Sequence, residues 1–304
     1  MIKDGTYIPE GDGMYEIIKM LVRHAEKLGV TILTNQEVIG FSFNSRNEIN
    51  SVILKNSQSI TNISHIISSN DYHNTEIMLP QELQSYTPKY WSKLDLCPNV
   101  ILFHISLDIQ LSDLQFHNLF FNSFEFYVNR SSSELNTAPS GSDTLFILVP
   151  LLNEAKGKTD YELYNLVLDK LTLFTKINIR NHIKLKRTFK EQCFIKRFNA
   201  FKGNAYGAAC NFSQMAIFRP AIKSQKVPNL YFSGQLTVPG PGLPPCMVSG
   251  LIASNQLLKD IEEKKKLLEF SNRNYFSLSE IFFNVYLYFR DFISYITHVL
   301  RTLI

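Results

Sequence analysis

The stretch that most constrains the fold is residues 229–258, NLYFSGQLTVPGPGLPPCMVSGLIASNQLL. Three consecutive apolar residues from Leu230 predict a short buried strand. Gly234, Gly240 and Gly242 then allow backbone turns and close approaches that side chains would block. A helical pattern follows directly. A strand that runs through a Gly/Pro-rich turn into a helix is an arrangement suited to holding a cofactor.

The helix is expected to begin at Pro244 and Pro245, since proline lacks the N–H that the first helical turn leaves unbonded. Met247, Leu251 and Leu258, with Ser254 between them, recur at helical spacing, so we expect one packed face. The positive end of the helix dipole points back into the turn. An anionic group is therefore expected at that end.

This segment resembles the C-terminal signature of the bacterial-type phytoene desaturases, the FAD-dependent carotenoid desaturases. In that family the helix start lies beside the pyrimidine edge of the flavin. The alternative is a plain strand–loop–helix connection rich in glycine. The matching residues here are Asn229, Leu230, Tyr231, Phe232, Gly234, Thr237, Pro239, Gly240, Gly242 and Pro244.

Further motifs of the same family follow in the family's order. Residues 6–38 resemble its Pro-Gly-Gly-Met turn, helix and strand ending Asn-x-x-Val. HNLFF at 117–121, APSG at 138–141 and FNAFKGNAYG at 198–207 come next. The resemblance covers roughly residues 5–260 and is strongest to the Bacteroidetes-type branch.

The resemblance also implies cofactor contacts. Val38 is similar to the valine whose backbone meets the adenine, with a plain buried strand valine as the alternative, and Asn70 takes the place of the family's Ser-Asn turn. Amides such as those of Leu243, Cys246 and Met247 would face the N1 and O2 edge of the reduced flavin. The full implied cofactor set is Val38, Gly234, Gln235, Gly242, Leu243, Pro244, Cys246 and Met247.

In this family the flavin accepts a hydride from an allylic carbon, so the resemblance implies no catalytic side chain. His117 is therefore expected to be a hydrogen-bonded core histidine, and Phe116 stands where the family has a first histidine. No Cys/His spacing typical of a metal site is present.

The GxGxxG turn that holds the FAD pyrophosphate in such flavoproteins does not occur in this sequence. The chain is then a fragment, a split-gene product or a natural truncation, and the sequence does not separate these. We expect FAD to be held weakly or not at all. A separate N-terminal FAD-binding half is an expected partner.

The predicted fold class is α/β (α+β), the C-terminal two-thirds of a two-domain, Rossmann-like FAD-binding flavoprotein with an antiparallel-sheet substrate domain. We assign residues 1–80 to a partial FAD-binding domain, 81–205 to the substrate domain, 206–259 to a return into the FAD-binding domain and 260–304 to a hydrophobic helical tail. The expected helices are 14–28, ended by Gly29, and 160–174; the expected strands are 30–34, 38–43, 49–54, 59–67, 100–107, 124–128, 145–149 and 183–189.

An aromatic run is expected to line a tunnel for a long apolar polyene, which buried area alone would hold. Ordinary core packing is the alternative. The run comprises Phe116, Phe120, Phe121, Phe124, Phe126 and Tyr127.

Composition narrows the function classes. A net charge of +4, with 31 Lys and Arg scattered over 304 residues, speaks against nucleic-acid binding. Four separated cysteines and a polar N-terminus indicate reduced thiols in a cytoplasmic protein.

The tail from about residue 260 has an apolar stretch from Ile281 that is too short to span a bilayer. Its tyrosines suit the headgroup level, so we expect attachment to the inner face of the membrane. A helix docked on the protein, or a disordered extension, is the alternative.

Three functions stay open: a carotenoid desaturase or part of one; a related isomerase, saturase or oxygenase; and a non-catalytic polyene- or partner-binding remnant. Bound flavin would separate most of these.

Overall fold

The computed structural model describes residues 11, 13–121, 124–133, 135 and 138–272, with side chains up to residue 266. The chain divides into two compact units, Met1–Ala253 and Ser254–Ile304. The last helix, α6 (Leu243–Asn272), begins in the first unit and continues into the second. No helix in the described part of the chain has the length and apolar character that a bilayer crossing requires.

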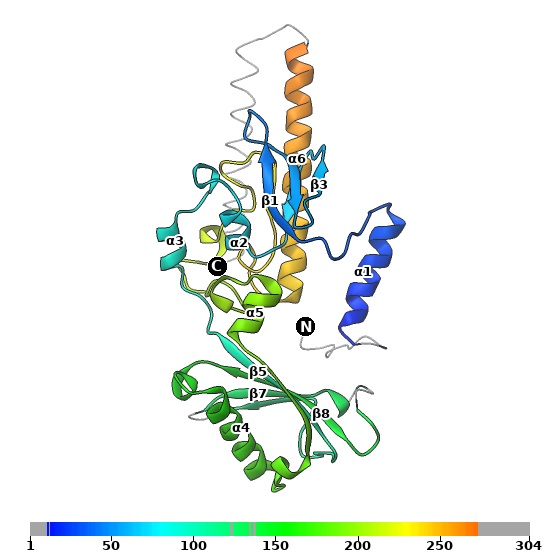
Figure 1. Ribbon diagram of the computed structural model, residues 1–304, viewed down its shortest axis with the longest axis vertical. Helices are drawn as coiled ribbons and strands as arrows, with labels where there is room; N and C mark the ends of the chain where they lie inside the picture. The colour runs from blue at the N-terminus through cyan, green and yellow to red at the C-terminus, as the bar shows by residue number, and fades with distance from the viewer. Residues whose placement is uncertain (1–10, 12, 122–123, 134, 136–137, 273–304) are drawn as a thin grey trace, which may run out of the picture. The chain divides into compact units, whose positions relative to one another are not determined.

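A five-stranded antiparallel sheet occupies the middle of the sequence, in the order β6-β7-β8-β5-β9 (Figure 1). Helix α4 (Asp160–Thr175) begins with a capping box between Thr159 and Glu162. The strands are β5 (Val100–Leu107), β6 (His117–Phe120), β7 (Phe126–Arg130), β8 (Asp143–Pro150) and β9 (Ile183–Phe189).

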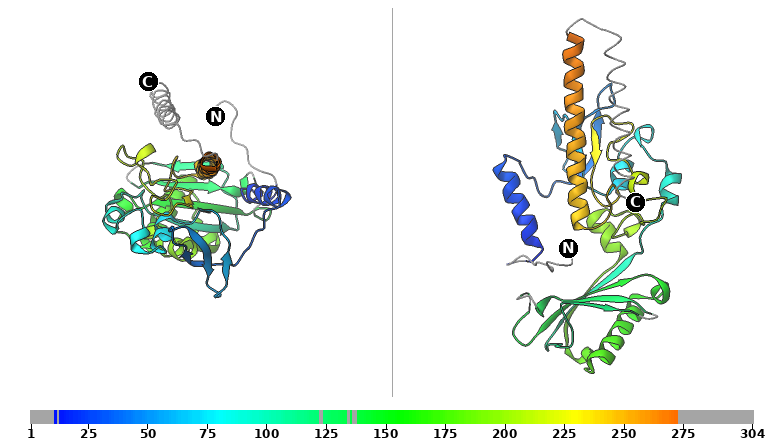
Figure 2. Two further views of the ribbon diagram at one scale, coloured as in Figure 1. Left: turned by 90° about the horizontal axis from the view of Figure 1, so that it is seen from above. Right: turned by 180° about the vertical axis from the view of Figure 1, so that it is seen from behind.

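Helix α4 covers one face of this sheet, and the two form a hydrophobic core between them (Figure 2). Every second residue of β5 and β8 is buried, which is the period of a strand with one covered face. Leu163, Val167 and Leu171 of α4, each at most 1% exposed, recur at helical spacing against it. Tyr161 of the same helix is 72% exposed and lies outside this core.

The opposite face of the sheet carries an apolar row set by the strand register. The cross-strand partners Phe189–Leu102, Leu102–Leu148, Leu148–Tyr127 and Tyr127–Leu119 follow one another across the strands. Paired residues point to the same side of a sheet. We call these five residues the open-face row; each is half-buried or exposed.

The aromatic run of residues 116–127 is divided between the two faces. Phe124 and Phe126 are 2% exposed in the core, and Phe120 stacks on Phe126. Tyr127 lies on the open face. His117 hydrogen-bonds Tyr127 Oη at 2.5 Å but is exposed, so the prediction of a core histidine is wrong.

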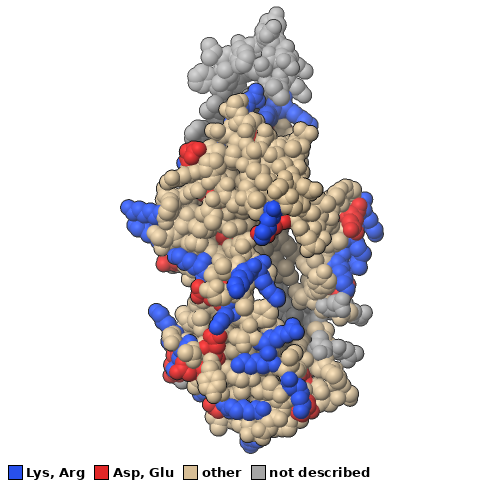
Figure 3. Space-filling model, in the orientation of Figure 1, with Lys and Arg blue, Asp and Glu red and all other residues tan. Residues whose placement is uncertain are grey.

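On the face shown in Figure 3, Lys and Arg side chains are interspersed with Asp and Glu.

A second core gathers segments that are far apart in the sequence. The meander β1 (Val38–Phe43), β2 (Ile49–Leu54) and β3 (Ser59–Thr61) is antiparallel, while β4 (Ile66–Ser68) pairs in parallel with β10 (Leu230–Phe232). All three residues of β10 are buried, as expected of a strand covered on both faces. The helices around this core are α2 (Tyr72–Ile77), α3 (Pro88–Lys93) and α5 (Glu191–Phe198).

Asn229 joins this meander to the parallel pair. Its side chain accepts the Ile49 N–H (2.9 Å) and donates to the carbonyls of Ile49 (2.8 Å) and Ser64 (3.1 Å). Its own carbonyl accepts the Ile66 N–H at 2.9 Å. One 5%-exposed amide therefore replaces strand pairing between β2 and the start of β4.

Helix α1 (Tyr15–Lys27) has no buried residue, and Gly29 ends it with φ +81° and an N–H bonded to Glu26. The part of the chain that the structure describes also has short 3-10 turns at Gln81–Leu83, Ser131–Ser133, Asn153–Ala155, Ile179–His182, Phe201–Gly203 and Ala216–Phe218.

Most expected elements are confirmed, with two exceptions. Residues 59–67 split into β3 and β4, which join different sheets. Residues 30–34 form no strand: Val30, Ile32 and Leu33 are 52%, 43% and 60% exposed. A strand exists only through bonds to a neighbouring strand, and no described strand lies beside this segment.

We expect Asn229→Ala to lower the free energy of unfolding by about 1–3 kcal/mol, because the buried Ile49 N–H and two carbonyls lose their partner. Chemical denaturation measures this loss. Asn56→Ala, at an exposed turn, is the control and should stay within about 0.5 kcal/mol of the parent. Equal losses in the two variants would contradict the role of Asn229.

Candidate functional site

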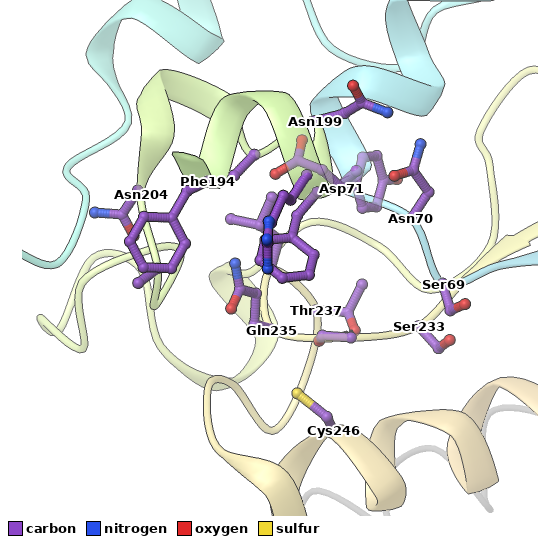
Figure 4. A pocket seen from close by; sticks show the side chains of 17 residues that line it. Ser69, Asn70, Asp71, Phe194, Asn199, Asn204, Ser233, Gln235, Thr237 and Cys246 are labelled. Carbon is purple, nitrogen blue, oxygen red and sulfur yellow. Dashed lines mark hydrogen bonds between the residues drawn. The ribbon is translucent and has the colours of Figure 1, made fainter. Parts of the chain in front are cut away.

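A cavity of about 600 Å³ lies where three separate stretches of the first unit meet (Figure 4). Residues 69–72 precede and begin α2, residues 194–205 run from α5 through the turn after it, and residues 233–237 follow β10. Cys246 of α6 completes the lining, with its sulfur directed toward the cavity. Segments that are over a hundred residues apart thus share one wall.

The loop after β10 is hydrogen-bonded to the buried side of α6. Ser249, fully buried, accepts the Gly234 N–H at 3.0 Å and lies 2.6 Å from the Thr237 hydroxyl. The Thr237 hydroxyl in turn donates to the Gly234 carbonyl at 2.9 Å. Gly234 has φ +119°, a conformation that favours glycine. These bonds fix residues 233–237 against the helix.

The wall from residues 199–205 is fixed by two polar side chains. Asp71 caps α2 through Asn74 N (3.1 Å) and also accepts the Phe201 N–H (3.0 Å). Asn204, 3% exposed, bonds the Cys97 carbonyl and accepts the Tyr206 N–H at 2.9 Å. The turn after α5 is therefore held both to α2 and to the segment before β5.

A buried arginine, Arg219, hydrogen-bonds the loop after β10. Arg219, 5% exposed, donates to the carbonyls of Gln235 (3.1 Å) and Ala208 (3.3 Å), while its Nε has no hydrogen-bond partner. A Cβ on Gly240 would come within 3.0 Å of the Arg219 guanidinium. Glycine at 240 thus permits the loop to lie flat on this side chain.

The cavity offers recognition groups rather than acid–base machinery. Among the described residues, its lining holds amides, hydroxyls and aromatic rings, one cation (Arg197) and one carboxylate (Asp71), with no histidine. Burial raises the pKa of Asp71, opposed by its backbone hydrogen bonds, and burial raises the pKa of the Cys246 thiol. Among the described residues no cluster could hold a metal ion. Such a surface suits a flat, polar-edged ring system.

Of the eight residues expected to contact a cofactor, Gly234, Gln235 and Cys246 line this cavity. The other five do not. Val38 is the first residue of β1, paired with Leu54 and 37% exposed. Gly242, Leu243, Pro244 and Met247 are exposed at the start of α6.

The expected packed face of α6 is wrong. Met247, Leu251 and Leu258 are 45%, 60% and 55% exposed; the buried face instead carries the small residues Ser249 and Ala253. Small side chains let the helix lie close to the loop.

The amide donors also differ from the expectation. The Cys246 N–H donates to the Gly242 carbonyl at 2.9 Å. Met247 lies four residues after Leu243 in α6, and in an α-helix an N–H donates to the carbonyl four residues earlier. Of these three amides, that of Leu243 is the one that has no acceptor within the α-helical pattern.

Several lining residues were not assigned a role from the sequence. Asn199 and Asn204 lie within the FNAFKGNAYG motif, and Asn70 lies at the expected Ser-Asn turn. Asn199, with φ +51°, ends α5 in a left-handed conformation that asparagine tolerates, which is a local signal for a turn. Phe194 and Arg197 lie on α5, and no local pattern indicates that they face a cavity.

The chain is similar in sequence to carotenoid desaturases. It is 29% identical over 282 residues to a carotenoid 3,4-desaturase of Haloarcula japonica, covering 84% of this chain and 56% of that protein. A 4,4'-diapophytoene desaturase of Staphylococcus aureus is 25% identical over 290 residues, covering 85% and 57%. The chain thus spans a little over half the length of these relatives. No protein-family model matches it.

Solved structures show the same fold. A putative protoporphyrinogen oxidase from Exiguobacterium sp. 255-15 aligns with a TM-score of 0.53 at 13% identity, over 80% of this chain and 51% of that one. A putrescine oxidase variant, redesigned in cofactor binding, aligns with a TM-score of 0.56 at 14% identity, over 81% and 53%. These solved structures share the mixed α/β architecture of the chain, which confirms the expected fold class.

We expect Ser249→Ala to lower the free energy of unfolding by about 1–3 kcal/mol, because the buried Gly234 N–H loses its acceptor. Denaturant titration measures the loss. Asn255→Ala, on the exposed side of the same helix, serves as the matched control. If Ser249→Ala matches that control, the loop is not held by this bond.

Proposed function

Because the chain is a homologue of the carotenoid desaturases, we propose that it is an FAD-dependent oxidoreductase of carotenoid biosynthesis that desaturates phytoene or a similar long polyene. One observation carries the proposal: stretches that match three separate family motifs, at Asn70, 198–207 and 229–258, all contribute to one cavity. Nothing in short-range folding requires those stretches to meet.

The cavity residues fit the ring system of a flavin. Amides of Asn70, Asn199 and Gln235 supply donors and acceptors for its polar edges, and Phe194 and Phe198 supply apolar contact. FAD, when bound, supplies the hydride acceptor, so no side chain needs redox chemistry. A cavity of about 600 Å³ is within the usual size range of ligand pockets.

The polyene would be held by the open face of the five-stranded sheet. The open-face row crosses five strands, four steps of roughly 4.8 Å or about 19 Å in all, and its residues are Phe189, Leu102, Leu148, Tyr127 and Leu119. An extended hydrocarbon gains most from such a continuous apolar strip. Strand β9, where the row starts at Phe189, leads directly into α5 and thus to the cavity.

The alternative is a polyene- or partner-binding protein without catalysis of its own, because the open-face row would bind an apolar chain without any redox group. A related isomerase, saturase or oxygenase would use the same cavity. Purified chain assayed with phytoene and FAD, with product absorption as the readout, separates desaturation from the rest.

We expect the purified chain to bind FAD weakly, and Gly242→Val to lower that affinity at least tenfold. Gly242 has φ +117°, which valine rarely adopts, and the new Cβ would meet Pro245 Cδ at 3.3 Å. Flavin fluorescence titration measures both. Gly157→Val, at φ +80° in open space, is the matched control for strain away from the cavity.

Stoichiometric FAD after gel filtration would contradict weak binding. Equal affinity of the Gly242→Val variant and the parent would show that the turn at Gly242 does not support FAD binding.

We further propose attachment to the cytoplasmic face of the membrane, with the tail as anchor; residues 273–304 lie outside the described part of the chain. A chain ending at Asn272, where α6 ends, should stay in the supernatant in a liposome flotation assay while the full chain floats. Burying several apolar side chains contributes several kcal/mol at ~25 cal/mol per Å². If both chains float equally, the tail is not the anchor.

A further inference from the structure

Arg219 carries a buried hydrogen-bond donor that the fold leaves unused. Its side chain is 5% exposed, and Nη1 donates to the Gln235 carbonyl at 3.1 Å. Nη2 donates to the Ala208 carbonyl and to the Cys210 sulfur, both at 3.3 Å. Nε is buried and has no hydrogen-bond partner in the described part of the chain. A buried N–H without an acceptor costs free energy, so this group gains from any further acceptor beside it.

The Cys210 sulfur contacts the edge of the guanidinium that carries this donor. Nε and Nη2 present N–H bonds along one edge of the planar group. A thiol sulfur is a weak acceptor, and at 3.3 Å from Nη2 it contacts that edge without satisfying Nε. An oxygen atom bonded to the sulfur would be a stronger acceptor for the same edge.

Cys210 is also the cysteine that an oxidant in water reaches most directly. It is exposed, whereas Cys97, Cys193 and Cys246 are half-buried. Burial raises the pKa of the Cys97 and Cys246 thiols, which keeps them in the protonated form that reacts poorly. Exposure and the adjacent buried cation therefore distinguish Cys210 from the other thiols.

We propose that Cys210 is a site of reversible oxidation by hydroperoxides, at which Arg219 binds the oxygen added to the sulfur. The sulfur attacks one peroxide oxygen, so an S–O bond forms as the O–O bond breaks. The sulfur is oxidised by two electrons to a sulfenic acid, and the thiol proton leaves on the other oxygen as water or an alcohol. Two equivalents of a thiol reduce the sulfenic acid back to the cysteine and release water.

The modification acts on the cavity loop through Arg219. The same guanidinium supports the Gln235 carbonyl and lies against Gly240, where a Cβ would come within 3.0 Å of it. A new acceptor on the Nε and Nη2 edge draws the group toward residue 210 and weakens its bond to Gln235. Hydrogen exchange of the loop amides of Gly234 and Thr237 should then become at least threefold faster in the oxidised chain.

Chemical trapping of sulfenic acid in the purified full chain tests the proposal. Hydrogen peroxide is added together with dimedone, and peptide mass spectrometry measures the label at each cysteine. Cys210 should carry at least tenfold more label than Cys97 or Cys246. Ser140→Cys places a reference thiol at an exposed turn, and Cys210 should label at least fivefold faster than this reference in the same chain.

Arg219→Lys keeps the charge but lacks the Nε edge, and it should lower the label at Cys210 at least fivefold. Arg46→Lys, at an exposed turn, is the matched control and should leave the label unchanged. The reference thiol separates exposure from the effect of Arg219 even if Arg219→Lys does not fold.

Equal labelling of Cys210 and the reference thiol would overturn the proposal, as would equal labelling of all four native cysteines. Unchanged exchange of the Gly234 and Thr237 amides after oxidation would overturn the action on the cavity loop. None of these readouts depends on flavin or polyene, so they stand apart from the desaturation assay.

Discussion

The side-chain amide of Asn229 is the interaction on which the cavity region depends. It bonds both backbone groups of Ile49 and the Ser64 carbonyl, while its own carbonyl starts the ladder at Ile66. A side-chain amide carries an NH₂ donor and a carbonyl acceptor, as the backbone does, so it can stand in for a strand. It ties the start of β10 to the meander, and the cavity loop follows β10 directly.

Small side chains, rather than large apolar ones, form the contact between the cavity loop and α6. Ser249 and Ala253 let α6 approach the loop, and the Ser249 hydroxyl satisfies the Gly234 amide in the same contact. Arg219 lies flat under Gly240 and bonds the Gln235 carbonyl from the other side. The loop is thus held from two directions by side chains, and its cavity face is left free for a ligand. This is how a Gly/Pro-rich loop keeps one conformation.

Local pattern was enough to predict the helices α1 and α4 and most of the strands, since each has its own period. It also indicated the strand–turn–helix of residues 229–258. It did not indicate which side of α6 is buried: Met247 and Leu251 suggest one face, whereas the packed face carries Ser249 and Ala253. The apolar rule fails there because the requirement is close approach, which favours small residues. The contribution of α5 to the cavity is a tertiary property that no local signal encodes.

Residues 30–34 also show that local sequence alone does not determine structure. Their composition predicts a strand, yet the structure gives them none, while Leu230 to Phe232 form one with only three residues. The difference lies in their neighbours: β10 has β4 beside it and Asn229 to set the register, and 30–34 have neither. Strand propensity is a preference for a half-buried pleated surface, and it is realised only where that surface exists.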